Sequence, residues 1–246
     1  MSKRPALWAR ALRRAKREMQ KPFRRVLRSF HALPTIELAE IARDEVQLEP
    51  LILDDICLPP HHDPPDHDDA TPVLKIARSR QPRVILEFGT AYGNLTANLC
   101  RQCPQARVYT VNAPVEEQTG VLTSFDLTKE QIGRVYRAHG FAPRVVQIYA
   151  DTMRMDLSPH FPKPVVELAI IDACHDTEYV INDFRKVQPF VIPGGLVLFH
   201  DTFPSLYTSH LDGSYRACLE LRRQGHDIRH LKNTWWGVWI QPGELR

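Results

Sequence analysis

Short apolar runs rich in Val, Ile and Leu alternate with segments of helical periodicity from residue 74 onward. The apolar runs predict strands at 83–88, 107–112, 144–150, 165–173, 195–201, 227–232 and 236–241. The segments between them predict helices at 74–80, 93–102, 128–139, 176–189 and 213–224. Such alternation is typical of a mostly parallel sheet covered by helices on both faces. We therefore expect an α/β fold with a seven-stranded sheet, whose ligands bind outside the carboxyl ends of the strands.

The amino-terminal part of the chain has a different, amphipathic pattern. Its apolar residues recur every three or four positions, which is helical spacing: Trp8, Leu12, Ala15, Met19, Phe23, Val26 and Phe30. Pro22 is expected to divide this helix in two, and residues 35–57 suggest another short helix. The proline-rich stretch "LPPHHDPPDHDDATP" at 58–72 predicts a solvated loop or an active-site lid. The predicted division is a basic helical extension at 1–57, this loop, and a domain at 73–246.

Charge also separates the extension from the domain. The net charge is +3, but residues 1–31 hold eleven Lys and Arg against Glu18 alone, so this arm carries +10 and the remainder −7. A basic amphipathic helix can bind an anionic membrane surface or nucleic acid. We favour packing on the protein's own domain or on another subunit of a homo-oligomer, because charged helix faces are usually solvated. The acidic remainder shows no interleaving of aromatic and basic residues, which argues against a nucleic-acid-binding module.

Two features bear on the compartment. No apolar run is long enough to span a bilayer, and the amino terminus lacks the apolar core of a secretory signal. The five cysteines are an odd number and fit a reducing compartment better than a disulfide framework. We therefore expect a cytoplasmic protein. Cys100 and Cys103 form a CxxC, but without a second pair at zinc-binding spacing we interpret them as ordinary helix residues.

The stretch "RVILEFGTAYGNLTANLC" at 83–100 predicts a strand, a glycine loop and a helix. The strand carries Glu87 near its end, and Gly89 and Gly93 follow. A nicotinamide dinucleotide site requires the pattern GxGxxG, but Ala91 stands where the middle glycine would be. A P-loop is excluded as well, because no GK[ST] follows the glycines. The loop therefore predicts another kind of ligand.

The ExGxxxG arrangement resembles motif I of the class I S-adenosylmethionine-dependent methyltransferases. The resemblance covers residues 74–241 and implies a Rossmann-like methyltransferase fold with S-adenosylmethionine as the cofactor. It implies that Glu87 holds the amino-acid end of the cofactor. Asn112 ends the second strand, where the family usually has Asp or Glu for the ribose hydroxyls. The implied cofactor-binding residues are Glu87, Gly89, Thr90, Gly93, Asn94, Asn112, Asp151, Thr152 and Asp172, with Asp151 and Thr152 beside the adenine.

Two later strands end in ionisable residues, in "IIDACHDTEY" and "PGGLVLFHD". If these strands are neighbours, Asp172, His200 and Asp201 meet at the cofactor edge of the sheet. Two buried carboxylates are costly unless a cation compensates them, and a divalent metal would do so. Mg²⁺ prefers such oxygen ligands, whereas the imidazole of His200 would tolerate Mn²⁺ or Fe²⁺ more readily. Each residue alone is more often a helix cap or part of a turn, so it is their joint placement that indicates a site.

This combination resembles the metal-dependent O-methyltransferases of the catechol type and the sugar- and antibiotic-modifying enzymes of bacterial secondary metabolism. The resemblance implies Asp172 and Asp201 as metal ligands, His200 as a third, Mg²⁺ as the favoured metal, and His175 as the general base beside the catalytic Asp172. We therefore predict divalent-metal-assisted O-methylation of a small-molecule hydroxyl, on a natural product, a sugar or a phenol. A nucleic-acid methyltransferase that uses the basic arm, and a catalytically silent cofactor-binding protein, stay open as alternatives.

Overall fold

The computed structural model describes residues 33–42, 46–54, 70–117, 126–202 and 212–243 of the chain. Two compact units divide the chain, Met1–Leu33 and Pro34–Arg246, and nearly all described residues belong to the second. The helix predicted at 1–31 and most of the loop predicted at 58–72 lie outside the described residues. The boundaries predicted at 57 and 72 fall inside the second unit. Among the described helices, none is long and apolar enough to cross a membrane.

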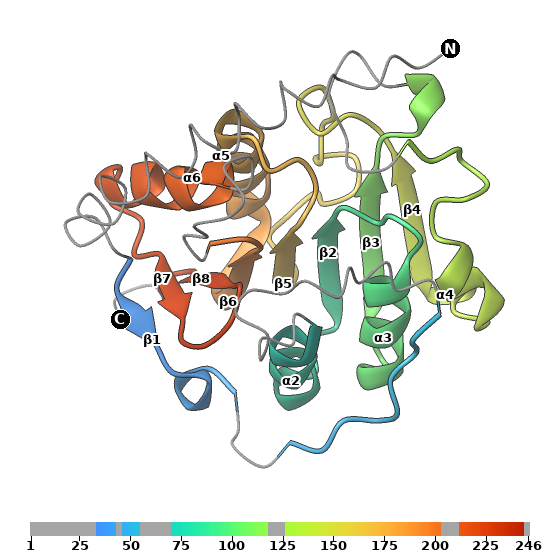
Figure 1. Cartoon of the computed structure of the whole chain (residues 1–246), viewed down its shortest axis with the longest axis horizontal. Helices are drawn as coiled ribbons and strands as arrows, with labels where there is room; N and C mark the ends of the chain where they lie inside the picture. The colour runs from blue at the N-terminus through green and yellow to red at the C-terminus, as the bar shows by residue number, and fades with distance from the viewer. Residues whose placement is uncertain (1–32, 43–45, 55–69, 118–125, 203–211, 244–246) are drawn as a thin grey trace, which may run out of the picture. The chain divides into compact units, whose positions relative to one another are not determined.

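The second unit is built on one sheet of eight strands, in the order β1-β7-β8-β6-β5-β2-β3-β4 (Figure 1). In that order the strands span Thr35–Ile36, Arg229–Leu231, Gly237–Ile240, Val191–Phe199, Val166–Ile171, Val84–Phe88, Arg107–Asn112 and Val145–Tyr149. β8 is antiparallel to both of its neighbours, and every other neighbouring pair is parallel. The prediction of a mostly parallel α/β sheet is confirmed, and each of the seven predicted strands is present. The short edge strand β1 has no counterpart in the prediction.

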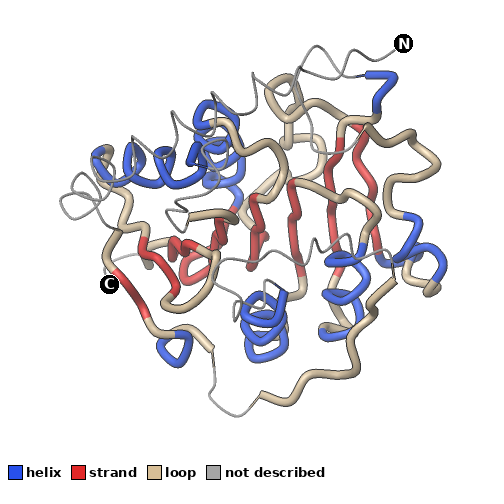
Figure 2. The backbone as a smooth tube through the Cα atoms, in the orientation of Figure 1, coloured by secondary structure: helices blue, strands red, loops and turns tan. Residues whose placement is uncertain are grey.

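Helices cover both faces of this sheet (Figure 2). The described helices are α2 (Ala70–Arg80), α3 (Asn94–Gln102), α4 (Arg134–Ala138), α5 (Thr177–Val187) and α6 (Asp212–Arg223), with short 3-10 helices η1 (Leu38–Glu40), η2 (Val115–Glu117), η3 (Ala142–Arg144) and η4 (Gln188–Phe190). On one face, buried residues of α2 and α3 share a core with Leu196 and Leu198 of β6. On the other, the ring of Phe184 in α5 lies 5.5 Å from that of Phe199 in β6. Burial on both faces explains why the strands are continuous apolar runs.

Strand register sets the position of the loops that follow the strands. Phe88 of β2 pairs with Val111 of β3 on one side and with Ile171 of β5 on the other. Ile171 in turn pairs with Phe199 of β6. The carboxyl ends of these parallel strands are therefore level, and the loops after them meet at one edge of the sheet, where ligands of this architecture bind.

The helix predicted at 35–57 is wrong. Residues 35–42 form β1 and η1, and residues 46–54, which we call the strap, have no regular secondary structure except for a turn at the last residue. Side-chain amides of α3 form hydrogen bonds with the backbone of the strap, as a neighbouring strand would. Asn98 exchanges two hydrogen bonds with the backbone of Ile52, at 2.8 and 3.0 Å, and Gln102 does the same with Glu49, at 2.9 and 3.0 Å. Backbone groups that are hydrogen-bonded to side chains of α3 are not available for the hydrogen bonds of a helix. The local sequence pattern did not indicate these partners.

The helix predicted at 128–139 is also wrong in its first half, because residues 129–133 form turns and only α4 is helical. Gly133 has a φ of +72°, and a Cβ atom there would lie 2.2 Å from the ring of Tyr136. The interpretation of Cys100 and Cys103 as ordinary helix residues fits the structure, since both are free thiols buried at the end of α3.

Candidate active site

The glycine loop, residues 89–93, connects β2 to α3 at the carboxyl edge of the sheet. Gly89 and Gly93 have φ values of +104° and +83°, which residues with side chains rarely adopt. Space excludes a side chain as well. A Cβ atom at Gly93 would lie 2.8 Å from the ring of Tyr136, and one at Gly89 would meet the backbone of Asp172. Packing against neighbouring elements therefore requires both glycines, whatever ligand the loop holds.

Glu87 lies near the end of β2 with its side chain fully enclosed, at 0% exposure. Its Oε2 accepts hydrogen bonds from the hydroxyls of Thr96 and Thr110, each at 2.5 Å, and its Oε1 has no hydrogen-bond partner among the described residues. Burial raises the pKa of Glu87 to about 7, and the two hydroxyls oppose this rise only in part. A direct contact with the amino-acid end of the cofactor would require the site to open, so that role stays a prediction.

Thr90 points into the protein beneath the glycine loop. Its hydroxyl lies 2.7 Å from that of Thr110 and accepts a hydrogen bond from Gln147 Nε2 at 2.9 Å. Gln147 Oε1 accepts one from the Tyr136 hydroxyl at 3.2 Å. Because Thr110 donates to Glu87, a continuous hydrogen-bond chain runs from Tyr136 to that carboxyl group. The side chain of Thr90 is thus used internally, which leaves its backbone for the predicted contact with the cofactor.

Asn112 and Asn94 both have structural partners. Asn112 Oδ1 accepts a hydrogen bond from the backbone N–H of Ala91 at 3.0 Å, so the end of β3 holds the glycine loop. Its amide still has one hydrogen and one lone pair for ribose hydroxyls. Asn94 donates to the backbone oxygens of Ile52 and Asp54, at 3.1 and 2.7 Å, and therefore holds the strap. The predicted cofactor contact thus remains open for the side chain of Asn112, and that of Asn94 turns toward the strap.

Asp151 and Thr152 follow β4 and differ in exposure. Asp151 is half-buried, and its Oδ1 accepts a hydrogen bond from the backbone N–H of Met153 at 3.0 Å. Thr152 is 6% exposed, and its backbone oxygen accepts a hydrogen bond from Asn182 of α5 at 3.1 Å. Of the pair predicted beside the adenine, Asp151 is the one whose side chain reaches the surface.

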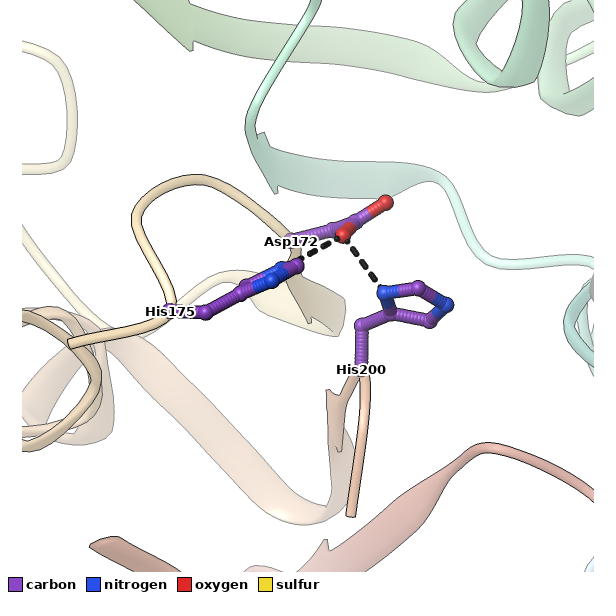
Figure 3. Close-up of side chains that lie close together, drawn as sticks. All are labelled: Asp172, His175 and His200. Carbon is purple, nitrogen blue, oxygen red and sulfur yellow. Dashed lines mark hydrogen bonds and ion pairs between the residues drawn. The ribbon is translucent and has the colours of Figure 1, made fainter. Parts of the chain in front are cut away.

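Asp172, His175 and His200 bring their ligating atoms together at the ends of β5 and β6 (Figure 3). Asp172 Oδ1 lies 3.2 Å from His175 Nε2 and 2.8 Å from His200 Nδ1. One ligating atom of each residue lies within 4.8 Å of the other two. The two loops thus meet as the order of the strands requires. The role of Asp172 and His200 as metal ligands stays a prediction.

Asp201 lies beside the same group of residues, as the sequence suggested. It has a φ of +54° and is 6% exposed. Its Oδ2 lies 3.1 Å from Nδ1 of His175, whereas its Oδ1 lies 3.6 Å from Nδ1 of His200. Asp201 therefore faces the ring nitrogen of His175 that Asp172 does not contact. The group of three residues with ligating atoms within 4.8 Å includes His175 rather than Asp201, and the role of Asp201 as a metal ligand stays a prediction.

His175 is held between these two carboxylates. Burial lowers its pKa, but hydrogen bonds to Asp172 and Asp201 outweigh burial and raise the pKa to about 9. Burial likewise opposes ionisation of the carboxyl groups, yet the two histidines hold the pKa of Asp172 and of Asp201 below the usual range. With both ring nitrogens facing carboxylates, the imidazole is protonated near neutral pH. His175 can act as the predicted base only when one carboxylate has another partner.

The loop from Asp172 to His175 is fixed by close packing of the backbone. Gly89 lies against the carbonyl group of Asp172, and a Cβ atom at Gly213, in α6, would lie 2.0 Å from the carbonyl oxygen of His175. The ring of Trp236 lies 4.7 Å from that of His200. The cluster is therefore built on rigid elements, which suits a site that must hold reacting groups in fixed positions.

Two of three comparisons with known proteins found similarity to this chain. Residues 86–202 match a family model described as a methyltransferase domain. In a search of solved structures, the chain is similar to a Staphylococcus aureus protein described as a caffeoyl-CoA O-methyltransferase, with 15% identity and a TM-score of 0.52, over 70% of this chain and 81% of that one. It is also similar to an O-methyltransferase from Bacillus cereus in complex with SAH, with 17% identity and a TM-score of 0.50, over 72% and 82%. None of the curated proteins matches the chain significantly.

The fold and the loop at the end of β2 define a Rossmann-like methyltransferase domain. The matched residues run from Leu86 in β2 to Thr202 after β6, and so include every strand end described above. Over these residues the chain matches the methyltransferase domain family.

Several residues that shape the site were not found from the sequence. Gln147, Thr96 and Thr110 hold Glu87 and the glycine loop, and no local pattern distinguishes them from other strand and helix residues. Asp183 is fully buried in α5. It did leave a signal, because it lies among Val180, Phe184 and Val187 on the apolar face of the predicted helix.

Proposed function

We propose that the protein is an S-adenosylmethionine-dependent O-methyltransferase that acts on a hydroxyl group of a small molecule with the help of a divalent metal. The observation that carries this proposal is the meeting of Asp172, His175 and His200 at the ends of β5 and β6. Their loop packs directly on Gly89 of the glycine loop, so a methyl acceptor bound at the cluster would lie beside the cofactor. Such juxtaposition is the main requirement for a transfer between two bound reactants.

The donor atoms of the cluster suit a divalent ion. The 2.8 Å between Asp172 Oδ1 and Nδ1 of His200 brings one oxygen and one nitrogen donor close enough together for a single ion. Asp172 and His200 would hold the ion. The imidazole of His200 beside a carboxylate favours Mn²⁺ or Fe²⁺ over Mg²⁺, which prefers oxygen ligands. The metal that we expect from the geometry is therefore one that accepts nitrogen.

The chemistry follows from the positions of His175 and Asp201. Asp172 and His200 would hold an ion whose Lewis acidity would lower the pKa of the acceptor hydroxyl. When Asp172 serves as a ligand, Nε2 of His175 loses its carboxylate partner and can take the proton of the acceptor hydroxyl. Asp201 stays on Nδ1, where it orients the ring and stabilises the imidazolium that forms. The pair acts as a base and its orienting carboxylate.

The cofactor side is held by the ends of β2, β3 and β4. S-adenosylmethionine supplies an electrophilic methyl group, and the glycine loop, Asn112 and Asp151 offer backbone and side-chain polar atoms along the same edge. The acceptor would approach from the side of β5 and β6. The protein's contribution is alignment of the two reactants and removal of water from between them.

The test is methyl transfer from S-adenosylmethionine to a panel of catechols, phenols and sugars, with Mn²⁺ or Mg²⁺ present and the product identified by mass. Methylation of an oxygen on one member of the panel supports the proposal. Methyl incorporation into RNA, with none into the panel, would favour the nucleic-acid alternative. Tight binding of the cofactor without transfer to any acceptor would indicate a catalytically silent protein.

A further inference from the structure

Helix α5 links the metal-binding cluster to the loop that follows β4. The helix begins two residues after His175, and two of its side chains contact the loop after β4. Asn182 donates to the backbone oxygen of Thr152 at 3.1 Å, and Lys186 donates to that of Met155 at 2.6 Å. The loop that carries Asp151 is therefore held by side chains of α5.

Asp183 is the buried member of this contact. Its Oδ1 accepts a hydrogen bond from Asn182 Nδ2 at 2.9 Å, and its Oδ2 is enclosed without a hydrogen-bond partner in the part of the chain that the structure describes. The Thr152 hydroxyl is enclosed in the same way, and it lowers the pKa of this carboxyl group. The two groups face each other across the boundary between the helix and the loop, and a hydrogen bond between them would satisfy both.

The charge state of Asp183 follows from its surroundings. Burial raises its pKa to about 7, the Thr152 hydroxyl, the Asn182 amide and Lys186 lower it, and Asp151 raises it further. Cys174, in the loop after β5, and Tyr179, on α5 itself, are the other titratable groups that interact with it. Below neutral pH the carboxyl group is therefore neutral and can donate a hydrogen bond toward the loop. Above it, a second negative charge develops beside Asp151.

We propose that Asp183 is a positioning residue for the cofactor, which holds the loop after β4 against α5 through Thr152 and so keeps Asp151 at the carboxyl edge of the sheet. Core packing does not call for a polar residue here, since the apolar residues Val180, Phe184 and Val187 are the other buried residues of the helix. A buried polar group that packing does not require costs stability. The contact of the Asp183 carboxyl group with the loop after β4 explains why a polar residue stands at this position. The inference rests on the cofactor site of the proposed function.

The experiment is calorimetric titration of the purified chain with S-adenosylhomocysteine and, separately, with Mn²⁺. Asp183→Leu keeps the number and branching of the side-chain heavy atoms and removes the hydrogen bonds, so it should weaken binding of the nucleoside roughly ten-fold, as expected for one lost buried hydrogen bond, and leave Mn²⁺ affinity unchanged. Asp183→Asn keeps both a donor and an acceptor and should bind within about three-fold of the parent. Val187→Ala, which removes only packing from the same helix, serves as the matched control and should bind like the parent.

A pH series separates positioning from a purely structural effect and does not depend on the leucine variant folding. The parent should lose affinity for S-adenosylhomocysteine as the pH rises through about 7, because Asp183 ionises, and Asp183→Asn should lack that part of the loss. Equal affinity of Asp183→Leu and the parent, equal weakening by Val187→Ala, or identical pH profiles of the parent and Asp183→Asn would each overturn the inference. A parent that binds no S-adenosylhomocysteine at all would overturn the proposed function together with it.

Discussion

A Cβ atom at Gly89 would lie 2.1 Å from the carbonyl oxygen of Asp172, far closer than any such contact in a folded protein. The glycine loop and the loop that carries Asp172 and His175 are therefore in direct backbone contact. Asp172 also donates its backbone N–H to the carbonyl oxygen of Phe88 at 2.9 Å, just before that glycine. The two halves of the site cannot be displaced independently.

Gly89→Ala should therefore weaken binding of both S-adenosylhomocysteine and Mn²⁺, because the methyl group pushes the two loops apart. The matched control is Gly140→Ala. Gly140 has a comparable φ of +75° but no atom within 4 Å of the added Cβ, so it should lose only about 1 to 3 kcal/mol of stability through backbone strain. Calorimetric titration of both variants checks this. Unchanged Mn²⁺ affinity in Gly89→Ala would show that the loops are not coupled.

The buried carboxyl group of Glu87 should make stability depend on pH. Its pKa in the folded protein, about 7, exceeds its ordinary value of 4.5, so between these pH values the folded protein keeps a proton that the unfolded chain has released. The free energy of unfolding should fall as the pH rises across this range, by at most roughly 1.4 kcal/mol per pH unit from this group. Urea unfolding of the parent and of Glu87→Gln at pH 5, 6 and 7 measures it. An identical slope in both proteins contradicts the assignment.

The strap should depend on Asn98. This side chain makes two hydrogen bonds to the backbone of Ile52, both in a buried setting, so Asn98→Ala should lower the free energy of unfolding by about 2 kcal/mol. Arg101→Ala is the control, because it removes a single exposed hydrogen bond to Pro50 of the same strap and should cost less than about 0.5 kcal/mol. Equal losses in the two variants, measured by urea unfolding, would show that the strap is not held as described.

His175→Ala and Asp201→Asn separate the base from the residue that orients it. His175→Ala should lower turnover by about 10²- to 10⁴-fold, the usual contribution of a positioned general base, while S-adenosylhomocysteine binds as in the parent. Asp201→Asn keeps a polar contact to Nδ1 and loses the charge that stabilises the imidazolium, so it should lower turnover less than His175→Ala. Turnover with a saturating acceptor is the measurement. Parent-like turnover in His175→Ala would remove this residue from the mechanism.

The sheet was predictable because its strands are apolar on both faces, so each appears as an uninterrupted run between turns. The meeting of Asp172 and His200 followed from the rule that parallel strands present their carboxyl ends at one edge. The position of His175 between Asp172 and Asp201 did not follow, since it depends on side-chain conformations that no spacing determines. The strap was missed for another reason. Its hydrogen bonds come from Asn98 and Gln102, which lie 46 and 53 residues away from their partners in the sequence. Local periodicity carries no information about such distant partners.

The most direct test of the central claim uses an acceptor that the protein is found to methylate. The rate of S-adenosylhomocysteine formation is measured in excess chelator and again after Mn²⁺ or Mg²⁺ is restored. The same series is run on Asp172→Asn. We expect turnover to disappear in chelator, to return with the metal in the parent, and to stay absent in the variant, because Asp172 Oδ1 is the atom that both histidines share. Full turnover in chelator would contradict the account and leave Asp172, His175 and His200 as a metal-free cluster.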